Sequence, residues 1–170
     1  MNYASIRTCD IANGEGVRVS LFVSGCTHRC KGCFNEEAQA FDYGREFTAE
    51  TERELFAALE PSFISGLTLL GGEPMEPANQ RVLLPFLERF RMRFGNVKTL
   101  WVYTGCVYEK LIGPDGYPWR CEVTDRMLGL VDVLVDGPFV EGLKDISLRF
   151  RGSSNQRILH LVGGKVVEEL

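Results

Sequence analysis

Short apolar runs alternate with amphipathic stretches along this chain, and the two patterns predict strands and helices in turn. The apolar runs are rich in β-branched and aromatic residues, which favours strands. We expect strands at residues 17–23, 66–70, 99–103 and 131–135. Apolar residues at helical spacing predict three helices, one capped by Thr48, one after Pro77 and one over residues 125–130.

This order of elements predicts parallel strands joined by right-handed crossovers. Near the end, apolar runs at 157–162 and 165–167 flank Gly163 and Gly164, which is typical of a two-residue hairpin turn. A complete eight-unit barrel needs about 250 residues, whereas this chain has 170. We therefore expect one α/β domain, residues 1–170, built as an incomplete (β/α) barrel or an open, curved, mostly parallel sheet with a C-terminal β-hairpin.

Residues that could take part in binding or catalysis follow each expected strand. Cys26 follows the first strand, Gly72 the second, Thr104 the third and Asp136 the fourth. The carboxyl ends of parallel strands lie at one edge of the sheet, where α/β proteins build their sites. We therefore expect these four segments to meet.

Three of the six cysteines, Cys26, Cys30 and Cys33, are spaced Cys-x3-Cys-x2-Cys. Four-iron clusters bind four thiolates, so three would leave one iron open to an outside ligand. A zinc site that includes His28 and inert buried thiols are alternatives, but the spacing favours the open cluster. The remaining cysteines share no ligand spacing, and we expect them to be ordinary small side chains: Cys9, Cys106 and Cys121.

Composition and charge narrow the class of protein. A hydrophobic share of 45% and a charged share of 25% are ordinary for a globular protein. The net charge of −4 argues against a protein that binds nucleic acid over its whole surface. No apolar run reaches the roughly 20 residues that cross a membrane, and no signal peptide is expected. We expect a cytoplasmic protein, without nucleic-acid or membrane partners, whose thiols stay reduced.

The cysteine triplet, followed after a second strand by Gly71-Gly72-Glu73-Pro74, resembles the radical S-adenosylmethionine superfamily. In that superfamily three cysteines hold a 4Fe-4S cluster, and the cofactor's methionine part chelates the fourth iron. The resemblance implies that Cys26, Cys30 and Cys33 are the metal ligands and that no catalytic residue is needed beyond cluster and cofactor. It also implies cofactor contacts at Gly32, Cys33, Phe34, Gly72 and Glu73.

Finer features resemble one branch, the activating enzymes of the anaerobic ribonucleotide reductase. The likeness covers nearly the whole chain and includes residues 10–18, 33–35, 103–105, 132–139 and 151–157. It implies that a flavodoxin-like donor reduces the cluster and that S-adenosylmethionine is cleaved to methionine and a 5′-deoxyadenosyl radical. That radical would take a hydrogen atom from a glycine of the reductase large subunit, the protein substrate, and leave a glycyl radical.

The chain also departs from this branch. Gln39 replaces a common tryptophan, Cys106 replaces a common aromatic residue, and residues 113–121 resemble an inserted loop. Two rival functions stay open: a radical enzyme acting on a small molecule, of the 7-deazaguanine synthase type, and a non-catalytic zinc-binding adaptor.

Several residues have two possible roles. Asp136 is a candidate cofactor contact or a turn residue, and His28 tunes the cluster or lies at the surface. Residues 10–18 form either a flexible loop over the open sheet edge, where the target would enter, or a plain turn. One further group would bind either the cofactor or the target: Arg151, Asn155 and Arg157. A basic stretch is either a solvated face or a docking site for the electron donor: Arg89, Arg91 and Arg93.

Overall fold

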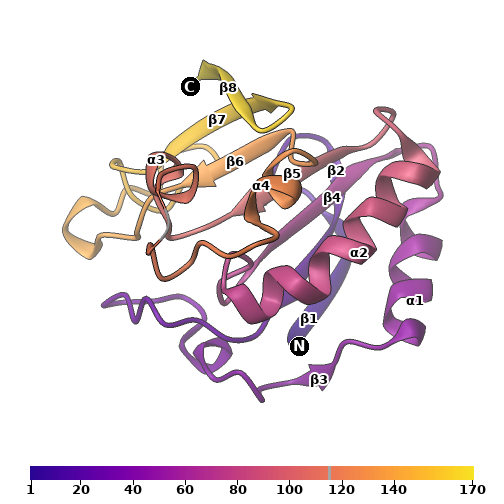
Figure 1. Ribbon diagram of the computed structural model, residues 1–170, viewed down its shortest axis with the longest axis horizontal. Coiled ribbons are helices and arrows are strands. Elements are labelled where there is room, and N and C mark those ends of the chain that lie inside the picture. The colour runs from indigo at the N-terminus through magenta and orange to yellow at the C-terminus, as the bar shows by residue number, and fades with distance from the viewer. Residues whose placement is uncertain (115) are drawn as a thin grey trace.

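The computed structural model describes residues 1–114 and 116–170, and within them one eight-stranded sheet organises the fold (Figure 1). The strand order is β3-β1-β2-β4-β5-β6-β7-β8, so β3 and β8 form the two edges and the sheet stays open. The strands are β1 (Asn2–Asp10), β2 (Val17–Val23), β3 (Arg45–Glu46), β4 (Ile64–Gly71), β5 (Thr99–Tyr103), β6 (Val133–Asp136), β7 (Arg157–Val162) and β8 (Lys165–Glu169).

The centre of the sheet is parallel and its flanks are antiparallel. β2, β4, β5 and β6 pair in parallel, whereas β1 runs against β2 and β7 runs against β6. The β7–β8 hairpin turns at Gly163 and Gly164, both at positive φ as the sequence predicts. The expectation of an open, mostly parallel α/β sheet with a C-terminal hairpin is confirmed.

Helices cover one face of the sheet (Figure 1). They are α1 (Ala49–Leu59), α2 (Pro77–Phe94), α3 (Tyr108–Leu111) and α4 (Thr124–Leu128), with short 3-10 turns η1 (Glu36–Gln39) and η2 (Glu141–Leu143) elsewhere. Thr48 caps α1 in a capping box with Thr51. In the described part of the chain, no helix has the length and apolar character that a membrane span requires.

The two faces of the sheet have different chemistry. On the helical face, alternate residues such as Leu21, Leu69 and Val102 join a large apolar core with α1 and α2. The opposite face carries a smaller apolar cluster around Trp101 and Val135 and polar side chains toward the other end of the strands. Among the described residues, no α-helix contributes to this second cluster.

Some boundaries differ from the sequence prediction. β1 and the short β3 were not expected, because β1 is an outer strand whose side chains are mostly polar and partly exposed. α4 ends at Leu128 rather than near residue 130, since Gly129 follows as its C-cap. The short α3 was also missed, because four residues do not establish a helical period.

Candidate cluster and cofactor site

The four predicted segments meet at a cavity of about 650 Å³ at the carboxyl ends of the central strands, a size typical of ligand sites. Loops from all four parallel strands line it. The contributing residues are Cys26, Cys30 and Cys33 after β2, Gly72 and Glu73 after β4, Thr104 and Gly105 after β5, and Gly137 after β6.

Residues 25–33, the cysteine loop, are held at their start by the backbone at the end of η1. The Gly25 amide donates to the Ala38 carbonyl (2.8 Å) and the Cys26 amide donates to the Gln39 carbonyl (3.1 Å). Gly25 has a φ of 96°, and a Cβ there would lie 2.4 Å from the Phe41 ring. Only glycine therefore fits this position.

The three thiols fit the open cluster that their spacing predicts. Cys26, Cys30 and Cys33 line the same cavity, and no further cysteine does so among the described lining residues. Burial raises the pKa of Cys26 to about 12 and also raises that of Cys30, so both are protonated thiols at neutral pH without a metal. Iron would have to displace those protons, because metals bind the thiolate form.

Gly72 is fixed by packing against the cysteine loop. A Cβ at this position would lie 2.7 Å from the Gly25 carbonyl oxygen and 2.8 Å from that of Ala38. The Gly72 amide donates to the Val23 carbonyl at 2.7 Å. This glycine therefore lets β4 approach the loop that carries the thiols.

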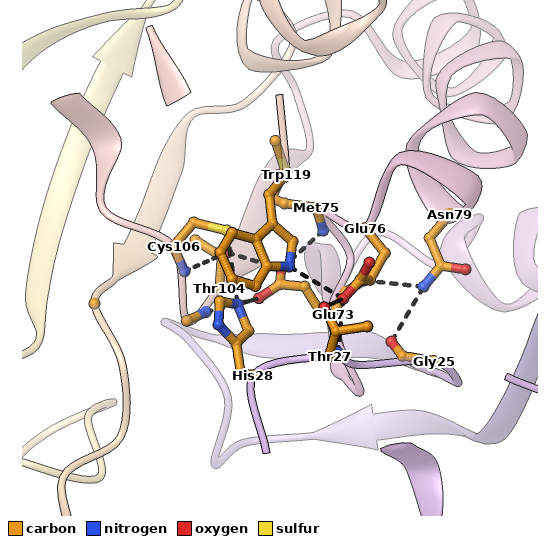
Figure 2. A network of polar contacts seen from close by, with 12 residues as sticks. Gly25, Thr27, His28, Glu73, Met75, Glu76, Asn79, Thr104, Cys106 and Trp119 are labelled. Carbon is orange, nitrogen blue, oxygen red and sulfur yellow. Dashed lines mark hydrogen bonds and ion pairs between the residues drawn. The ribbon is translucent and has the colours of Figure 1, made fainter. Parts of the chain in front are cut away.

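Glu73 is buried, and its carboxylate is engaged within the protein. One oxygen accepts hydrogen bonds from the Met75 amide (2.8 Å) and the Thr104 hydroxyl (2.7 Å). The other accepts from the Gly105 amide (2.8 Å) and lies 2.7 Å from His28 Nε2. The carboxylate thus ties the ends of β4 and β5 to the cysteine loop (Figure 2).

His28 belongs to this network, and the surface alternative is wrong. Its side chain is 10% exposed, and its Nε2 lies 3.7 Å from Cys106 Sγ. His28, Glu73 and Cys106 bring three possible metal-ligand atoms within 4.8 Å of one another. The hydrogen bonds from Met75, Thr104 and Gly105 already satisfy the carboxylate, so internal bonding accounts for this cluster.

Asp136 lies at the end of β6, as the sequence predicts, but its carboxylate points into the protein. It is fully buried and accepts hydrogen bonds from the Tyr108 amide (2.8 Å) and from Arg157 Nε (2.9 Å). Arg157 also binds Glu109. These contacts favour the structural alternative, in which Asp136 joins β6 to β7 and α3.

Of the three polar candidates near the C-terminus, only Arg151 lines the cavity. Its guanidinium donates to the Gln156 carbonyl (3.0 Å), while its Nε is buried without a hydrogen-bond partner. Asn155 instead donates to the Pro138 carbonyl (2.8 Å). Arg151 is therefore the member of this group placed to meet a ligand.

Gly32 and Phe34 stand on either side of Cys33. Gly32 has a φ of 72°, and Phe34 lines the cavity with a 72% exposed side chain. The Phe34 ring lies 5.8 Å from that of Phe139. Two aromatic rings thus border the mouth of the cavity, which suits stacking against a flat ligand.

The loop between β1 and β2 lies against the cavity, and hydrogen bonds from buried side chains hold its backbone. Arg18 is fully buried and donates to Thr68 Oγ1 (2.6 Å) and to the Glu15 carbonyl (3.2 Å). Thr68 in turn donates to the Asn13 carbonyl at 2.8 Å. The loop therefore presents Asn13 to the cavity from a fixed backbone.

The basic stretch at the end of α2 is not a free positive surface. Arg89 binds Glu52, Arg91 binds Asp132 and the Leu130 carbonyl, and Arg93 binds Glu60. Because each guanidinium has an acidic partner, the solvated-face alternative is favoured over donor docking.

The sequence did not single out two residues at the start of α2 that hold the cysteine loop in place. Asn79 donates to the Ser24 carbonyl (3.0 Å) and the Glu73 carbonyl (2.9 Å). Glu76 accepts from the Thr27 amide (2.7 Å) and hydroxyl (2.6 Å). Their sequence signal is weak, since both resemble ordinary first-turn polar residues of a helix.

Comparison with known proteins decides the family. A 4Fe-4S single cluster domain model matches residues 12–159. Curated relatives called anaerobic ribonucleoside-triphosphate reductase-activating protein are similar over almost the whole chain. One from Pasteurella multocida (strain Pm70) is 42% identical over 93% of this chain and 96% of its own length. The chain belongs to this family of activating proteins.

Other members of the family are similarly related. The relative from Escherichia coli (strain K12) is 40% identical over 95% of this chain and 99% of its own length. That from Enterobacteria phage T4 is 39% identical over 93% of both chains. The family assignment and the 4Fe-4S domain agree with the cysteine-lined cavity and argue against a zinc adaptor.

Proposed function

We propose that this protein activates an anaerobic ribonucleotide reductase by cleaving S-adenosylmethionine reductively and making a glycyl radical on the reductase. The observation that carries the proposal is the convergence of Cys26, Cys30 and Cys33 on one cavity in a chain related over nearly its full length to activating proteins of that name. We also propose a cytoplasmic location and treat residues 1–170 as one radical S-adenosylmethionine domain.

The three thiols would hold a 4Fe-4S cluster with one iron left for the cofactor. Such a cluster, once reduced by a flavodoxin-like protein, would supply the electron that breaks a carbon–sulfur bond of the sulfonium. The products would be methionine and a 5′-deoxyadenosyl radical, which would take a hydrogen atom from a glycine α-carbon of the reductase to give 5′-deoxyadenosine and the glycyl radical.

Different residues of the cavity would contact different parts of the cofactor. Gly72 and the backbone beside Glu73 would face the cofactor's methionine amino group, since carbonyl oxygens suit an ammonium. Phe34 would pack against the adenine, with Gly32 giving the loop its turn. Asp136 would not contact the cofactor, because its buried carboxylate already accepts hydrogen bonds from Arg157 and the Tyr108 amide.

The exposed apolar side chains at the mouth of the cavity also favour a protein as the substrate. Phe34, which lines it, and Ile11, next to the lining residue Ala12, are 72% and 75% exposed. Apolar side chains at an opening favour contact with another protein. A bound partner would exclude water from the reacting radical.

The direct test is anaerobic reconstitution followed by electron paramagnetic resonance. We expect about four irons per chain, and loss of the reduced-cluster signal when Cys26, Cys30 or Cys33 is replaced by Ala. Cys9→Ala is the matched control and should keep the signal, because Cys9 lies exposed on β1. Equal loss in Cys9→Ala would show that the ligand set is wrong.

Adding the partner reductase to the reaction tests whether the substrate is a protein or a small molecule. Reduced enzyme, S-adenosylmethionine and the partner reductase should give the glycyl doublet, and a reductase with the target glycine changed to Ala should not. Formation of 5′-deoxyadenosine without any doublet would contradict the activating role and favour a small-molecule radical enzyme.

A further inference from the structure

Trp119 lies directly on the segment that connects the first two cysteines of the loop. Its ring stacks on the His28 imidazole, with centroids 4.2 Å apart and the planes inclined by only 12° (Figure 2). Trp119 comes from residues 113–121, the stretch that resembles an insertion relative to the activating enzymes. The extra loop thus reaches a histidine two residues from Cys26.

Two anchors hold Trp119 in this position, Glu76 at the N-cap of α2 and Gln80 within the helix. The indole Nε1 donates to Glu76 Oε1 at 3.0 Å, the same oxygen that accepts both hydrogen bonds from Thr27. The Trp119 carbonyl accepts a hydrogen bond from the buried amide of Gln80 at 2.7 Å. Ring and backbone are therefore both fixed, which a loosely packed surface tryptophan would not be.

His28 is confined on its other sides as well. Its Nε2 lies 2.7 Å from Glu73, and a Cβ on Gly105 would lie 2.8 Å from its Cδ2. The imidazole thus lies between the end of β5 and the indole. Removing the indole would open this side of the cysteine loop to water.

We propose that Trp119 is a positioning residue that covers His28 in the cysteine loop and keeps the reduction potential of its cluster low. The inference rests on the proposed function, because it requires a cluster on Cys26, Cys30 and Cys33. Reduction adds negative charge to a cluster, and water stabilises that charge better than an aromatic ring does. A covered loop therefore disfavours reduction and makes the reduced cluster a stronger one-electron donor.

The test is a redox titration of reconstituted proteins, monitored by electron paramagnetic resonance, together with the rate of iron loss to a chelator. Trp119→Ala should bind as much iron as the wild type, shift the potential upward and lose iron about ten times faster. Trp119→Phe should restore most of the wild-type potential, because it keeps a ring on His28. Ile112→Ala, at a 47% exposed position just before the loop, is the control and should change neither quantity.

The outcomes separate the two proposals. A wild-type protein that binds no cluster would contradict the proposed function before any variant is compared. An unchanged or lower potential with an unchanged rate of iron loss in folded Trp119→Ala would overturn the role of Trp119 alone. If Trp119→Ala does not fold, Trp119→Gln decides by the same criteria, because its amide can still donate to Glu76 but offers no ring to His28.

Discussion

Single residues fix the distance between the cysteine loop and the sheet. Gly72 is the clearest case, because its α-carbon stands where any side chain would meet the Gly25 and Ala38 carbonyl oxygens. The contact is with backbone rather than with flexible side-chain ends, so the neighbouring chain has to move. A residue that the sequence associates with cofactor contact therefore also shapes the metal site.

Gly72→Ala should accordingly weaken both cluster retention and cofactor binding. The added methyl group would push the Gly25 end of the loop away from β4 and misplace Cys26. We expect lower iron content after reconstitution and weaker S-adenosylmethionine binding in a calorimetric titration. Gly142→Ala is the matched control, since a Cβ at Gly142 meets nothing within 4 Å. Normal iron content and affinity in Gly72→Ala would contradict the packing argument.

Asp10 gives a prediction about pH. Burial by itself would raise its pKa, but hydrogen bonds from the Asn13 side chain and the Ala12 amide help to lower it below its usual value. A lowered folded-state pKa stabilises the fold above the unfolded-state value, about 4, and this contribution is lost as pH falls through the folded-state pKa. Asp10→Asn should therefore reduce the free energy of unfolding by about 1 kcal/mol at pH 7.

The same difference should shrink below about pH 4, where the wild-type carboxyl becomes protonated. Urea denaturation of both proteins at neutral and acid pH measures it. A difference that stays constant with pH would show that the charge of Asp10 contributes nothing and that only its shape matters.

At the scale of elements, the start of α2 organises the site. Glu76 binds Thr27 in the cysteine loop, and Asn79 joins the Ser24 carbonyl before that loop to the Glu73 carbonyl after β4. Pro77 at the first helical position fixes where the helix begins. The helix thus supports the loop along one side while the Glu73 carboxylate supports it at the end of β5.

Asn79→Ala should destabilise the protein, because it removes a buried donor from the Ser24 carbonyl and leaves the Glu73 carbonyl with only the hydrogen bond from the Glu76 amide. The expected loss in the free energy of unfolding is about 2 kcal/mol, measured by urea denaturation. Arg81→Ala on the same helix is the control and should have a much smaller effect, since its ion pair with Glu122 is exposed. An equal loss in the free energy of unfolding for both substitutions would show that the buried hydrogen bonds of Asn79 contribute no special stability.

The sequence predicts the central elements well, and the physical reason is local. β2, β4 and β5 are mostly apolar and largely buried on both faces, and Gly163-Gly164 has few alternatives to a hairpin turn. β1 escapes prediction since its strand character depends on pairing with β2, not on its own composition. The stacking of Trp119 on His28 joins residues 91 positions apart, so no local pattern could reveal it.

At the scale of the whole molecule, the open sheet gives the cavity a mouth that another protein can cover. The β1–β2 loop stands beside this mouth and is fixed from beneath by Arg18 and Thr68. It carries the large apolar side chain of Ile11, which is 75% exposed. Because the backbone is held rigidly, Ile11 would contact a bound partner without a large loss of loop entropy.

Ile11→Asp should therefore impair the reaction with the reductase more than the cleavage of the cofactor. A charge at this apolar position would oppose close docking of the glycine-bearing segment, whereas the cysteines and Gly72 would keep their contacts. We expect at least a tenfold lower rate of glycyl radical formation, equivalent to about 1.4 kcal/mol, with little change in 5′-deoxyadenosine formed without reductase. Val167→Asp on the distant strand β8, also exposed, controls for added charge. Equal loss of both activities in Ile11→Asp would place Ile11 in the support of the cofactor site, and no loss of either would exclude the loop from the contact with the reductase.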